Sequence, residues 1–350
     1  MSSTPTRITI RRPDDWHLHV RDGKMLEAVL PYTASVFGRA ILMPNLVPPV
    51  RTTRDAVAYR ARVLAALPSG ARFTPLMTCY VTDDTDPDDV ARGFGEGVLA
   101  AAKLYPANAT TNSAAGVTDY RRIMRVLERM EKIDMPFLMH GEHVDDETDI
   151  FDREAVFIDR HLSKWVKQFP GLRMVLEHVS SKTGVDFVAG AAPQVGGTIT
   201  PYHLRLTRTD WLGSGLKPMM YAMPVIKTAA DRAALRKAAT SGAPCYFLGT
   251  DSAPHPLARK VAVNGVPGIF NAPVALSTYA EVFEAEGALV KLDAFASLNG
   301  PKHYRLPPNE DAITLEKSPW TAPVEIKVAG ADERALVYRG GETIAWRLVE

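Results

Sequence analysis

Cysteine is scarce in this chain, and long apolar runs are lacking. Only Cys79 and Cys245 occur among 350 residues, and both lie inside short apolar runs. This pattern is typical of buried, reduced thiols and argues against a disulfide framework or a zinc knuckle. No apolar run approaches the about 20 residues of a membrane-spanning helix, and residues 1–12 have no signal-peptide core. We therefore expect a cytoplasmic protein that does not contact a membrane.

An excess of charge of either sign is also lacking. Lysine and arginine number 41 and aspartate and glutamate 40, so no net field favours a nucleic acid or an anionic membrane as partner. Hydrophobic residues make up 46% and charged residues 23%, as in an ordinary globular protein. The length suits one barrel of about 250 residues with insertions and a tail, or two ordinary domains.

What the chain does contain is a series of eight short apolar runs, with helix-length segments in most of the gaps. The runs span residues 16–20, 40–43, 73–80, 98–105, 137–140, 174–178, 197–202 and 245–249. Their nearly continuous hydrophobicity is typical of strands that are covered on both faces, as in a parallel sheet. Repeated strand–helix units predict parallel strands, and eight of them predict an α/β fold of the (β/α)8 TIM-barrel type. A doubly wound open sheet is the alternative.

The last part of the chain departs from this pattern. Residues 324–328, 335–338 and 343–348 alternate or cluster like short strands, with a glycine pair as a turn. We interpret them as a C-terminal appendage rather than a second catalytic domain. We therefore expect one unit over 1–350, with the barrel at roughly 13–306 and the appendage at roughly 307–350.

Residues 106–116, PANATTNSAAG, contain no large apolar side chain. Nothing in this segment should anchor it to a core, so the sequence predicts a mobile loop. The loop is either a surface linker or a lid over a site. Its place just after the fourth strand favours the lid.

The positions of the histidines carry the main chemical signal. Four of the nine, His17, His19, His140 and His178, lie in or at the carboxyl ends of strand-like runs, where parallel α/β folds place their active sites. Residues i and i+2 of a strand face the same side, about 6.6 Å apart, so His17 and His19 can converge on one metal. Each histidine alone is more often structural, but four at one layer indicate a metal site.

The other histidines have weaker contexts. His203 follows the seventh strand and is a fifth candidate ligand. His143, His161 and His303 lie in loop-like or helix-like segments, and we expect them to be structural.

Two further residues extend this constellation. Asp251 ends the last run, where a carboxylate could hold a metal and exchange a proton with a water that the metal activates. Its alternative role is a helix N-cap before Pro254. Lys103 lies within a strand in an apolar context, so it must pair, lose its proton or change chemically. A neutral amine can add CO₂ to form a carbamate that bridges two metals. A salt-bridged lysine is the alternative.

Longer motifs surround these residues: DWHLHVRD at 15–22, MPN at 43–45, KLYPANATTN at 103–112, GTDSAPH at 249–255, FNAP at 270–273 and NGP at 299–301. With them the chain closely resembles, nearly end to end, the short bacterial dihydroorotases of the binuclear amidohydrolase branch. No metal position departs from the pattern of that family.

The resemblance implies a binuclear zinc enzyme with two Zn²⁺ per subunit. One zinc would be held by His17, His19 and Asp251 and the other by His140 and His178, with Lys103, carboxylated by CO₂, as the bridge. The implied reaction is the reversible closure of N-carbamoyl-L-aspartate to dihydroorotate and water in pyrimidine synthesis, with Asp251 carrying the proton. A homodimer is also implied.

The resemblance further implies which residues contact this small-molecule substrate. They are Arg21, Asn45, Thr110, Thr111, His140, Met223, His255 and Pro267. Arg21 would provide a planar two-point donor for a substrate carboxylate. Thr110 and Thr111 would close over the substrate, which agrees with the lid interpretation.

Two other functions are weighed against this one. A hydantoinase or allantoinase would share the metal residues but not the carboxylate clamp of Arg21, Asn45 and His255. A catalytically inactive homologue would have lost one or more metal ligands, and none is lost here.

Overall fold

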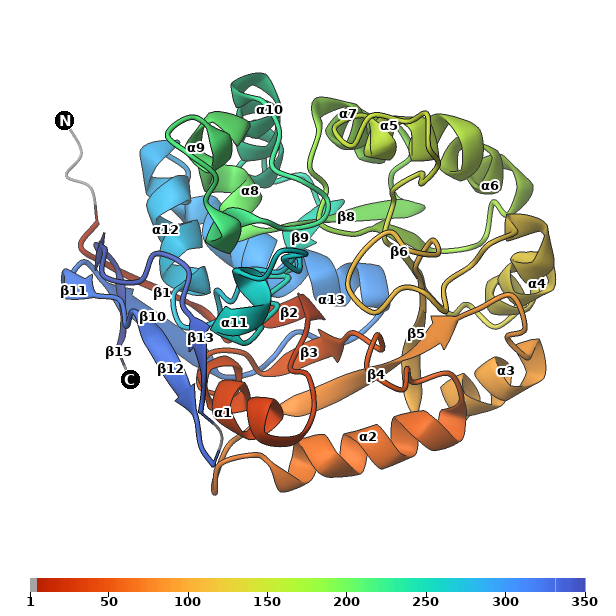
Figure 1. Ribbon diagram of the computed structural model, residues 1–350, viewed down its shortest axis with the longest axis horizontal. Coiled ribbons are helices and arrows are strands. Elements are labelled where there is room, and N and C mark those ends of the chain that lie inside the picture. Colours follow the sequence, from red (N-terminus) through yellow and green to blue (C-terminus); the bar gives the residue numbers. More distant parts are fainter. Residues whose placement is uncertain (1–4, 331, 350) are drawn as a thin grey trace.

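A parallel sheet of eight strands forms the centre of the protein, with strand order β2-β3-β4-β5-β6-β7-β8-β9 (Figure 1). The computed structural model describes residues 5–330 and 332–349. Residues 1–4, 331 and 350 belong to the unit predicted over 1–350 but lie outside the described residues.

The eight strands overlap the eight apolar runs. They are β2 (Asp14–Leu18), β3 (Arg39–Leu42), β4 (Thr74–Val81), β5 (Leu99–Leu104), β6 (Phe137–Met139), β7 (Met174–Leu176), β8 (Val195–Ile199) and β9 (Tyr246–Leu248). The first and last strands meet just beyond their ends, where Leu18 forms a parallel bridge with Ser252 and the Asp251 amide donates to the His17 carbonyl at 2.9 Å. The predicted barrel is confirmed, and the open doubly wound sheet is wrong.

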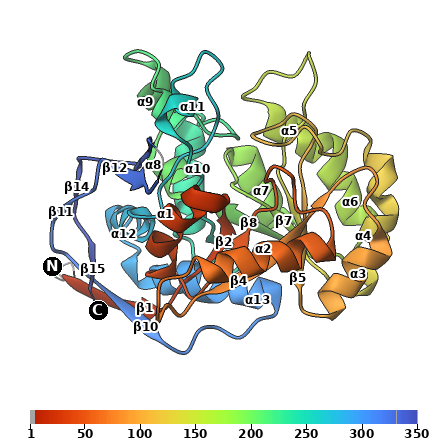
Figure 2. The same ribbon diagram turned by 60° about the horizontal axis from the view of Figure 1, so that its bottom comes forward.

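Helices surround the barrel (Figure 2). The longer ones are α1 (Gly23–Ala34), α2 (Thr53–Ala65), α3 (Pro87–Gly95), α4 (Met124–Lys132), α7 (Lys182–Gly190), α10 (Ala229–Ala239) and α12 (Ala275–Ala285). The shorter ones are α5 (Arg153–Phe157), α6 (Ser163–Gln168), α8 (Pro201–Arg205), α9 (Arg208–Leu212), α11 (Leu257–Lys260) and α13 (Asn299–Tyr304). Irregular turns are η1 (Tyr120–Ile123), η2 (Ile158–Leu162), η3 (Pro218–Met220), η4 (Leu289–Lys291) and η5 (Ala294–Leu298). Capping boxes at Thr52 and Thr228 fix where α2 and α10 begin, because each threonine and the aspartate three residues later satisfy the first free amides. No described helix is long and apolar enough to cross a membrane.

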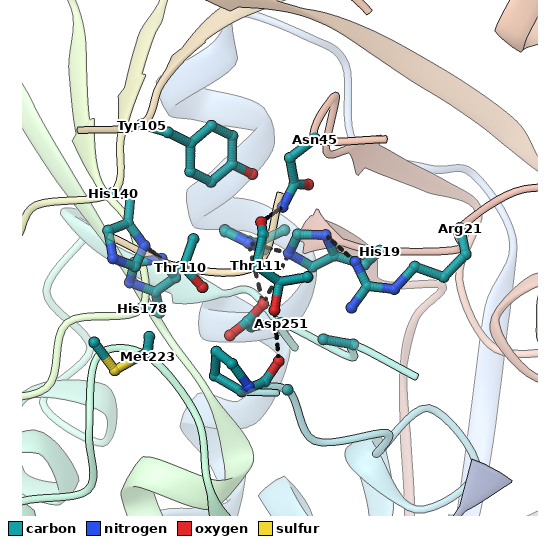
Figure 3. Close-up of a pocket in the computed structure, with 14 residues that line it drawn as sticks. His19, Arg21, Asn45, Tyr105, Thr110, Thr111, His140, His178, Met223 and Asp251 are labelled. Atoms are coloured by element: carbon teal, nitrogen blue, oxygen red, sulfur yellow. Dashed lines mark hydrogen bonds and ion pairs between the residues drawn. The ribbon is translucent and has the colours of Figure 1, made fainter. Parts of the chain in front are cut away.

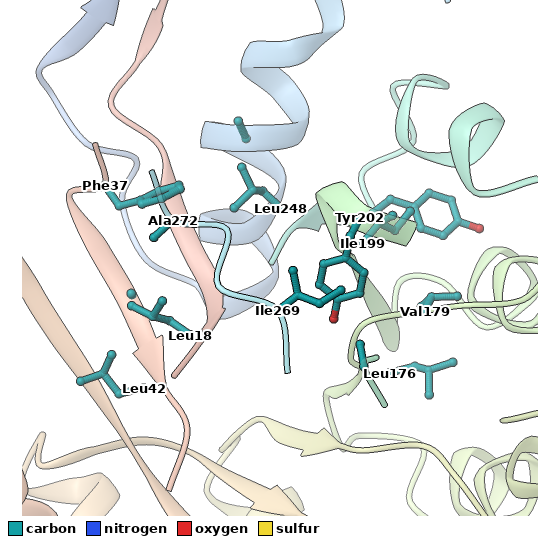
Figure 4. Close-up of a cluster of buried hydrophobic side chains, with 14 of the residues drawn as sticks. Leu18, Phe37, Leu42, Leu176, Val179, Ile199, Tyr202, Leu248, Ile269 and Ala272 are labelled. Carbon is teal, nitrogen blue, oxygen red and sulfur yellow. The ribbon is translucent and has the colours of Figure 1, made fainter. Parts of the chain in front are cut away.

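Alternation along the strands separates two cores. Leu18, Leu42, Leu176, Ile199 and Leu248 belong to the larger core, which packs the sheet against the helices (Figure 4). Other residues of the same strands fill the barrel itself, and they include Trp16, Ile41, Leu138, Val175 and Phe247, with Tyr304 of α13. The indole of Trp16 stacks on the ring of Tyr304 with centroids 4.2 Å apart. This interior cluster leaves the carboxyl ends of the strands for polar side chains.

A bulge in β2 prepares the strand for the site. Its register against β3 shifts between Asp15 and Leu18, so the strand contains one extra residue there. As a result Trp16 packs in the barrel interior, His17 also faces inward, and Leu18 packs outward against the helices. His17 and His19 both line the pocket, so they share a side as predicted, and Leu18 faces the opposite side.

The tail forms three small antiparallel sheets. They are β1 (Arg7–Arg11), β10 (Ala312–Glu316) and β15 (Arg347–Val349); β11 (Trp320–Thr321) and β14 (Thr343–Ile344); and β12 (Glu325–Val328) and β13 (Glu333–Leu336). The strand before the barrel was not predicted, although Arg-Ile-Thr-Ile-Arg alternates as an edge strand does. Its Ile8 and Ile10 lie opposite Leu315 and Ile313. The appendage thus includes residues from before the barrel, and the predicted division at residues 306/307 stays a prediction.

Cys79 and Cys245 are both free and buried, as the sequence predicts.

Gly300 tests how tightly the barrel floor is packed. A Cβ atom at this position of α13 would overlap the indole of Trp16. We expect Gly300→Ala to lower the free energy of unfolding by about 1–3 kcal/mol through overpacking, measured as a lower melting temperature. Gly190→Ala in α7 is the matched control, since a Cβ atom there would meet nothing within 4 Å. Equal melting temperatures for the two variants would contradict the packing described here.

Candidate active site

A pocket opens at the carboxyl ends of the barrel strands (Figure 3). Its lining residues are His17, His19, Arg21, Asn45, Tyr105, Thr110, Thr111, His140, His178, Met223, Asp251, Ala253, Pro267 and Gly268. The structure thus brings together most of the site residues predicted from the sequence. Their individual roles stay predictions.

Three of these residues present ligand atoms at metal spacing. His17 Nε2 lies 3.2 Å from both His19 Nε2 and Asp251 Oδ1, and the last two atoms are 3.1 Å apart. Ligand atoms that share one tetrahedral zinc, at bonds of about 2.0–2.1 Å, lie about 3.3 Å apart. His17, His19 and Asp251 could therefore hold one metal ion.

A second pair of ligand atoms comes from the residues that follow β6 and β7, which are neighbouring strands. His140 Nδ1 is 3.1 Å from His178 Nε2, which is again the spacing of two ligands on one ion. The other ring nitrogen of His140, Nε2, lies 2.7 Å from the buried carboxylate of Glu142. An outer carboxylate of this kind fixes the orientation of a ligating imidazole and decides which nitrogen faces the metal. The sequence analysis missed Glu142, although its place two residues after His140 is a usable signal.

Lys103 lies beneath the pocket, fully buried, in contact with the carboxylate of Glu177. Glu177 Oε2 is also 3.2 Å from His17 Nδ1. Burial lowers the pKa of Lys103 well below its ordinary value. A charge on Lys103 would lower the pKa of His17, His140 and His178 as well, so its amine lies within electrostatic range of both groups of ligands. Lys103 has both the acidic partner that an unmodified lysine needs and the depressed pKa that carboxylation needs.

Burial also keeps the imidazoles neutral, which is the form that binds a metal. It lowers the pKa of His19 to about 3 and that of His178 well below its ordinary value. Burial alone would raise the pKa of Asp251, but the adjacent His17 and His19 hold it well below its usual range. The donor set is therefore neutral imidazole plus ionised carboxylate, as zinc prefers.

Three site residues have positive φ angles, which residues other than glycine seldom adopt. The φ angles of Arg21, His178 and Asp251 are 61°, 43° and 44°. Such conformations cost on the order of 1–3 kcal/mol and cluster at functional sites. At His178 the reason is geometric. Because Glu177 already faces the barrel interior, a regular strand would point the next side chain outward, and the positive φ returns it to the pocket.

A buried carboxylate joins the two strands that carry the first ligand group. Asp15 Oδ1 accepts from the amides of His17 at 3.1 Å and Thr250 at 2.9 Å, and Asp15 Oδ2 accepts from the Thr250 hydroxyl at 2.5 Å. Burial raises the pKa of Asp15 to about 7, with these hydrogen bonds opposing it. The sequence analysis missed this role, because a contact between residues so far apart in the chain has no local signal.

Arg21 borders the pocket beside the first ligand group. Its Nη2 lies 2.8 Å from His255 Nε2, and its Nε donates to the Pro254 carbonyl at 2.9 Å. Burial lowers the pKa of Arg21 to about 10, so it remains a guanidinium at neutral pH. His255 lies behind Arg21 rather than in the pocket wall, so its predicted substrate contact has no direct counterpart in the lining.

The segment 106–116 lies over the pocket and is anchored there. The Thr111 hydroxyl donates to the Pro267 carbonyl at 3.1 Å, and Asn45 Nδ2 donates to the Thr111 carbonyl at 2.9 Å. Ala109 and Ser113 are buried. The expectation that nothing in the segment could anchor it is therefore wrong, because small side chains and backbone polar groups replace the missing large apolar ones. The segment has the position of a lid.

The remaining candidates lie elsewhere. His203 uses one ring nitrogen on Thr200 at 3.0 Å and the other on the Pro224 carbonyl at 3.1 Å, outside the pocket. His143 pairs with His161 at 3.2 Å, and His303 packs against Phe247 in the barrel floor. Asp251 is not a helix N-cap, since α11 begins only at Leu257. Among the pocket residues the sequence analysis did not name Tyr105, Ala253 and Gly268, although all but Gly268 lie inside its quoted motifs.

Comparison with known proteins places this site in a family. The model of the amidohydrolase family matches residues 4–341, so the chain belongs to that family. Within it the chain groups with the dihydroorotases. The dihydroorotase of Synechococcus sp. strain RCC307 is 54% identical over 350 residues, covering 100% of each chain.

Solved structures agree. A dihydroorotase from Saccharomyces cerevisiae, in complex with 5-fluoroorotic acid, matches with a TM-score of 0.91 and 31% identity over 99% of each chain. An L-hydantoinase from Arthrobacter aurescens matches with a TM-score of 0.77 but only 15% identity, over 97% of this chain and 87% of its own, and this likeness shows the fold alone.

Replacement of Lys103 tests the metal assignment. We expect Lys103→Ala to lose the metal pair and most activity, because a single methyl group would replace the side chain predicted to bridge the two metals. Lys103→Arg is the matched variant, since it keeps the charge but cannot form a carbamate. Metal analysis of the purified proteins, with circular dichroism to confirm folding, is the measurement. Two metals retained in either variant would exclude the carbamate bridge.

Proposed function

We propose that this protein is a binuclear zinc enzyme that interconverts N-carbamoyl-L-aspartate with (S)-dihydroorotate plus water in the de novo synthesis of pyrimidines (UMP). The observation that carries the proposal is the pair of ligand groups at metal spacing beside Arg21, a partly buried arginine that lines the same pocket. The full-length similarity to dihydroorotases supports the choice of substrate.

The metal residues divide into two sets and a bridge. His17, His19 and Asp251 would hold one Zn²⁺, His140 and His178 the other, and carboxylated Lys103 would lie between them. Their chemistry fits the metal, because imidazole and carboxylate are ordinary zinc ligands. Burial lowers the pKa of Lys103 well below its ordinary value, and a neutral amine is the form that can add CO₂. When bound, such a metal pair supplies Lewis-acid polarisation of a carbonyl and stabilises developing negative charge.

Asp251 would move the proton. Its Oδ2 accepts a hydrogen bond from the Tyr202 hydroxyl, while its Oδ1 faces His17 and His19. In the cyclisation direction the ureido nitrogen attacks the carboxylate carbon, and Asp251 takes the proton that this nitrogen loses as the C–N bond forms. Asp251 then returns the proton to the departing oxygen, which leaves as water with a second proton from solvent. An ionised carboxylate suits this general-base step.

Arg21 would bind the substrate carboxylate that does not react. A guanidinium offers two parallel donors to a carboxylate, and Arg21 is held in place by Pro254 and His255. Asn45, Thr110, Thr111, His140, Met223 and Pro267 line the same cavity, and the last two would contact the substrate through main-chain groups. The 5-fluoroorotic acid bound by the yeast relative is itself a pyrimidine carboxylic acid.

A homodimer and a cytoplasmic location complete the proposal. Both are carried over from the sequence and stay predictions. Size measurement in solution and fractionation of cells are their respective tests.

Substrate preference tests the choice among cyclic amides. We expect turnover of dihydroorotate to exceed that of hydantoin and allantoin, because only the first presents a carboxylate to Arg21. Steady-state kinetics of the zinc-loaded protein with each compound decide this. Faster turnover of hydantoin or allantoin would discard the proposed substrate, and a metal-free, inert preparation would favour an inactive homologue.

Removal of the Asp251 carboxylate tests the proton transfer. We expect Asp251→Ala to lower turnover by about 10²–10⁴-fold or more, since it removes a general base and a ligand together. Metal content, measured in the same samples, separates the two effects. Near-normal turnover in a variant that retains metal would exclude the acid–base role.

A further inference from the structure

Lys260, at the end of α11, is a buried cation without a buried anion. Only 2% of its surface is exposed, and no ion pair joins it to a carboxylate of the described residues. Buried charges are normally paired, because desolvation of an isolated one is costly. Burial, and then the nearby charge of Arg21, lower the pKa of Lys260 to about 7. A cation kept at such a cost calls for a specific use.

The ammonium group is instead saturated by backbone carbonyls. Lys260 Nζ donates to Tyr221 O at 2.9 Å, to Val266 O at 3.1 Å and to Gly268 O at 2.7 Å. These three bonds use all three N–H groups of the ammonium. They cross-link two segments far apart in the chain, and the Gly268 amide strengthens the link by donating to Tyr221 O at 2.9 Å.

Both cross-linked segments form the wall of the candidate active site. Met223 belongs to the first segment, and Pro267 and Gly268 to the second, and all three line the pocket. Gly268 is confined there, since a Cβ atom would come within 2.8 Å of Ala253 O and of His255 Cδ2. The backbone of this wall is thus closely packed, and Lys260 binds its carbonyl groups.

The Pro267 carbonyl, which lies between two carbonyls that Lys260 binds, points to the lid. Val266 O and Gly268 O accept from Lys260, while Pro267 O accepts the hydroxyl of Thr111 at 3.1 Å. The three successive carbonyls thus alternate between Lys260 and the lid. Fixing the carbonyls at 266 and 268 therefore aims the carbonyl at 267 toward the pocket, where Thr111 meets it.

We propose that Lys260 is a positioning residue for the lid: its ammonium group orients the Pro267 carbonyl and so holds Thr110 and Thr111 over the bound substrate. The inference rests on the proposed function for the identity of the substrate, but not for the contact between lid and wall. It assigns a role to a residue that touches neither substrate nor metal.

Lys260→Met tests this, because methionine keeps the length of the side chain and removes every donor. We expect zinc content to be unchanged, KM for dihydroorotate to rise about tenfold with a smaller effect on kcat, and amides of residues 107–115 to exchange about tenfold faster, each tenfold being about 1.4 kcal/mol. Lys291→Met is the matched control, since Lys291 Nζ also donates to a backbone carbonyl, Ser241 O at 3.0 Å, but at an exposed site away from the pocket. KM and exchange equal to those of the control would overturn the proposal.

A double-mutant cycle with Thr111→Val separates positioning from general loosening. If Lys260 acts through the Pro267 carbonyl, the double variant raises KM no more than the larger single effect. Multiplied effects on KM would overturn the proposal. Should Lys260→Met fail to fold, Lys260→Arg enters the same cycle, because its rigid fork cannot reproduce three convergent bonds; unchanged KM and exchange would then contradict the role. Hydrogen exchange measured without substrate reports on the lid whatever the substrate is. If Lys260→Met exchanges faster but the protein does not turn over dihydroorotate, the proposed function is refuted and the role of Lys260 is not.

Discussion

The closure of the barrel between β2 and β9 is the constraint on which the site depends. His17 and His19 come from the first strand and Asp251 from the end of the last, so their ligand atoms meet only if these strands are locked in register. Two backbone hydrogen bonds join the strands there, from the Asp251 amide to the His17 carbonyl at 2.9 Å and from the His19 amide to the Ser252 carbonyl at 3.0 Å. The carboxylate of Asp15 supplies the lock by accepting from both strands. The buried carboxylate of Asp15 thus helps to set the spacing of the candidate metal ligands.

Below the closure, apolar side chains fill the barrel, and the polar side chains of the candidate site lie above them. Trp16, Val175 and Phe247 fill the floor of the barrel, and the polar residues that follow them on the same strands form the layer above. The floor excludes water from below, which keeps Lys103 and the imidazoles in a low-dielectric setting and depresses their pKa values. The strained backbone at His178 and Asp251 is tolerated because strand and floor hold both sides of each residue in place.

The sequence was sufficient where the signal is local. Continuous hydrophobicity located all eight barrel strands, and the polar residues at their ends identified His17, His140 and Asp251. It failed where a role depends on distant partners. Asp15, Glu177 and Lys260 each contact at least one group tens to hundreds of residues away. The lid is anchored by backbone carbonyls that no side-chain pattern reveals. The strand at Arg7–Arg11 was missed although its residues alternate, because only its distant partner β10 shows that so short a segment is paired.

That last pairing has a consequence for how the protein is made. Thr9 meets Thr314 across 305 positions of sequence, so the strand synthesised first must wait for a partner that emerges only after the entire barrel. Until β10 is made, the backbone groups of β1 have no partner strand. They could then pair with another strand nearby. The tail strand β10 therefore covers the edge of β1, and a chain whose synthesis stops before β10 would leave that edge exposed.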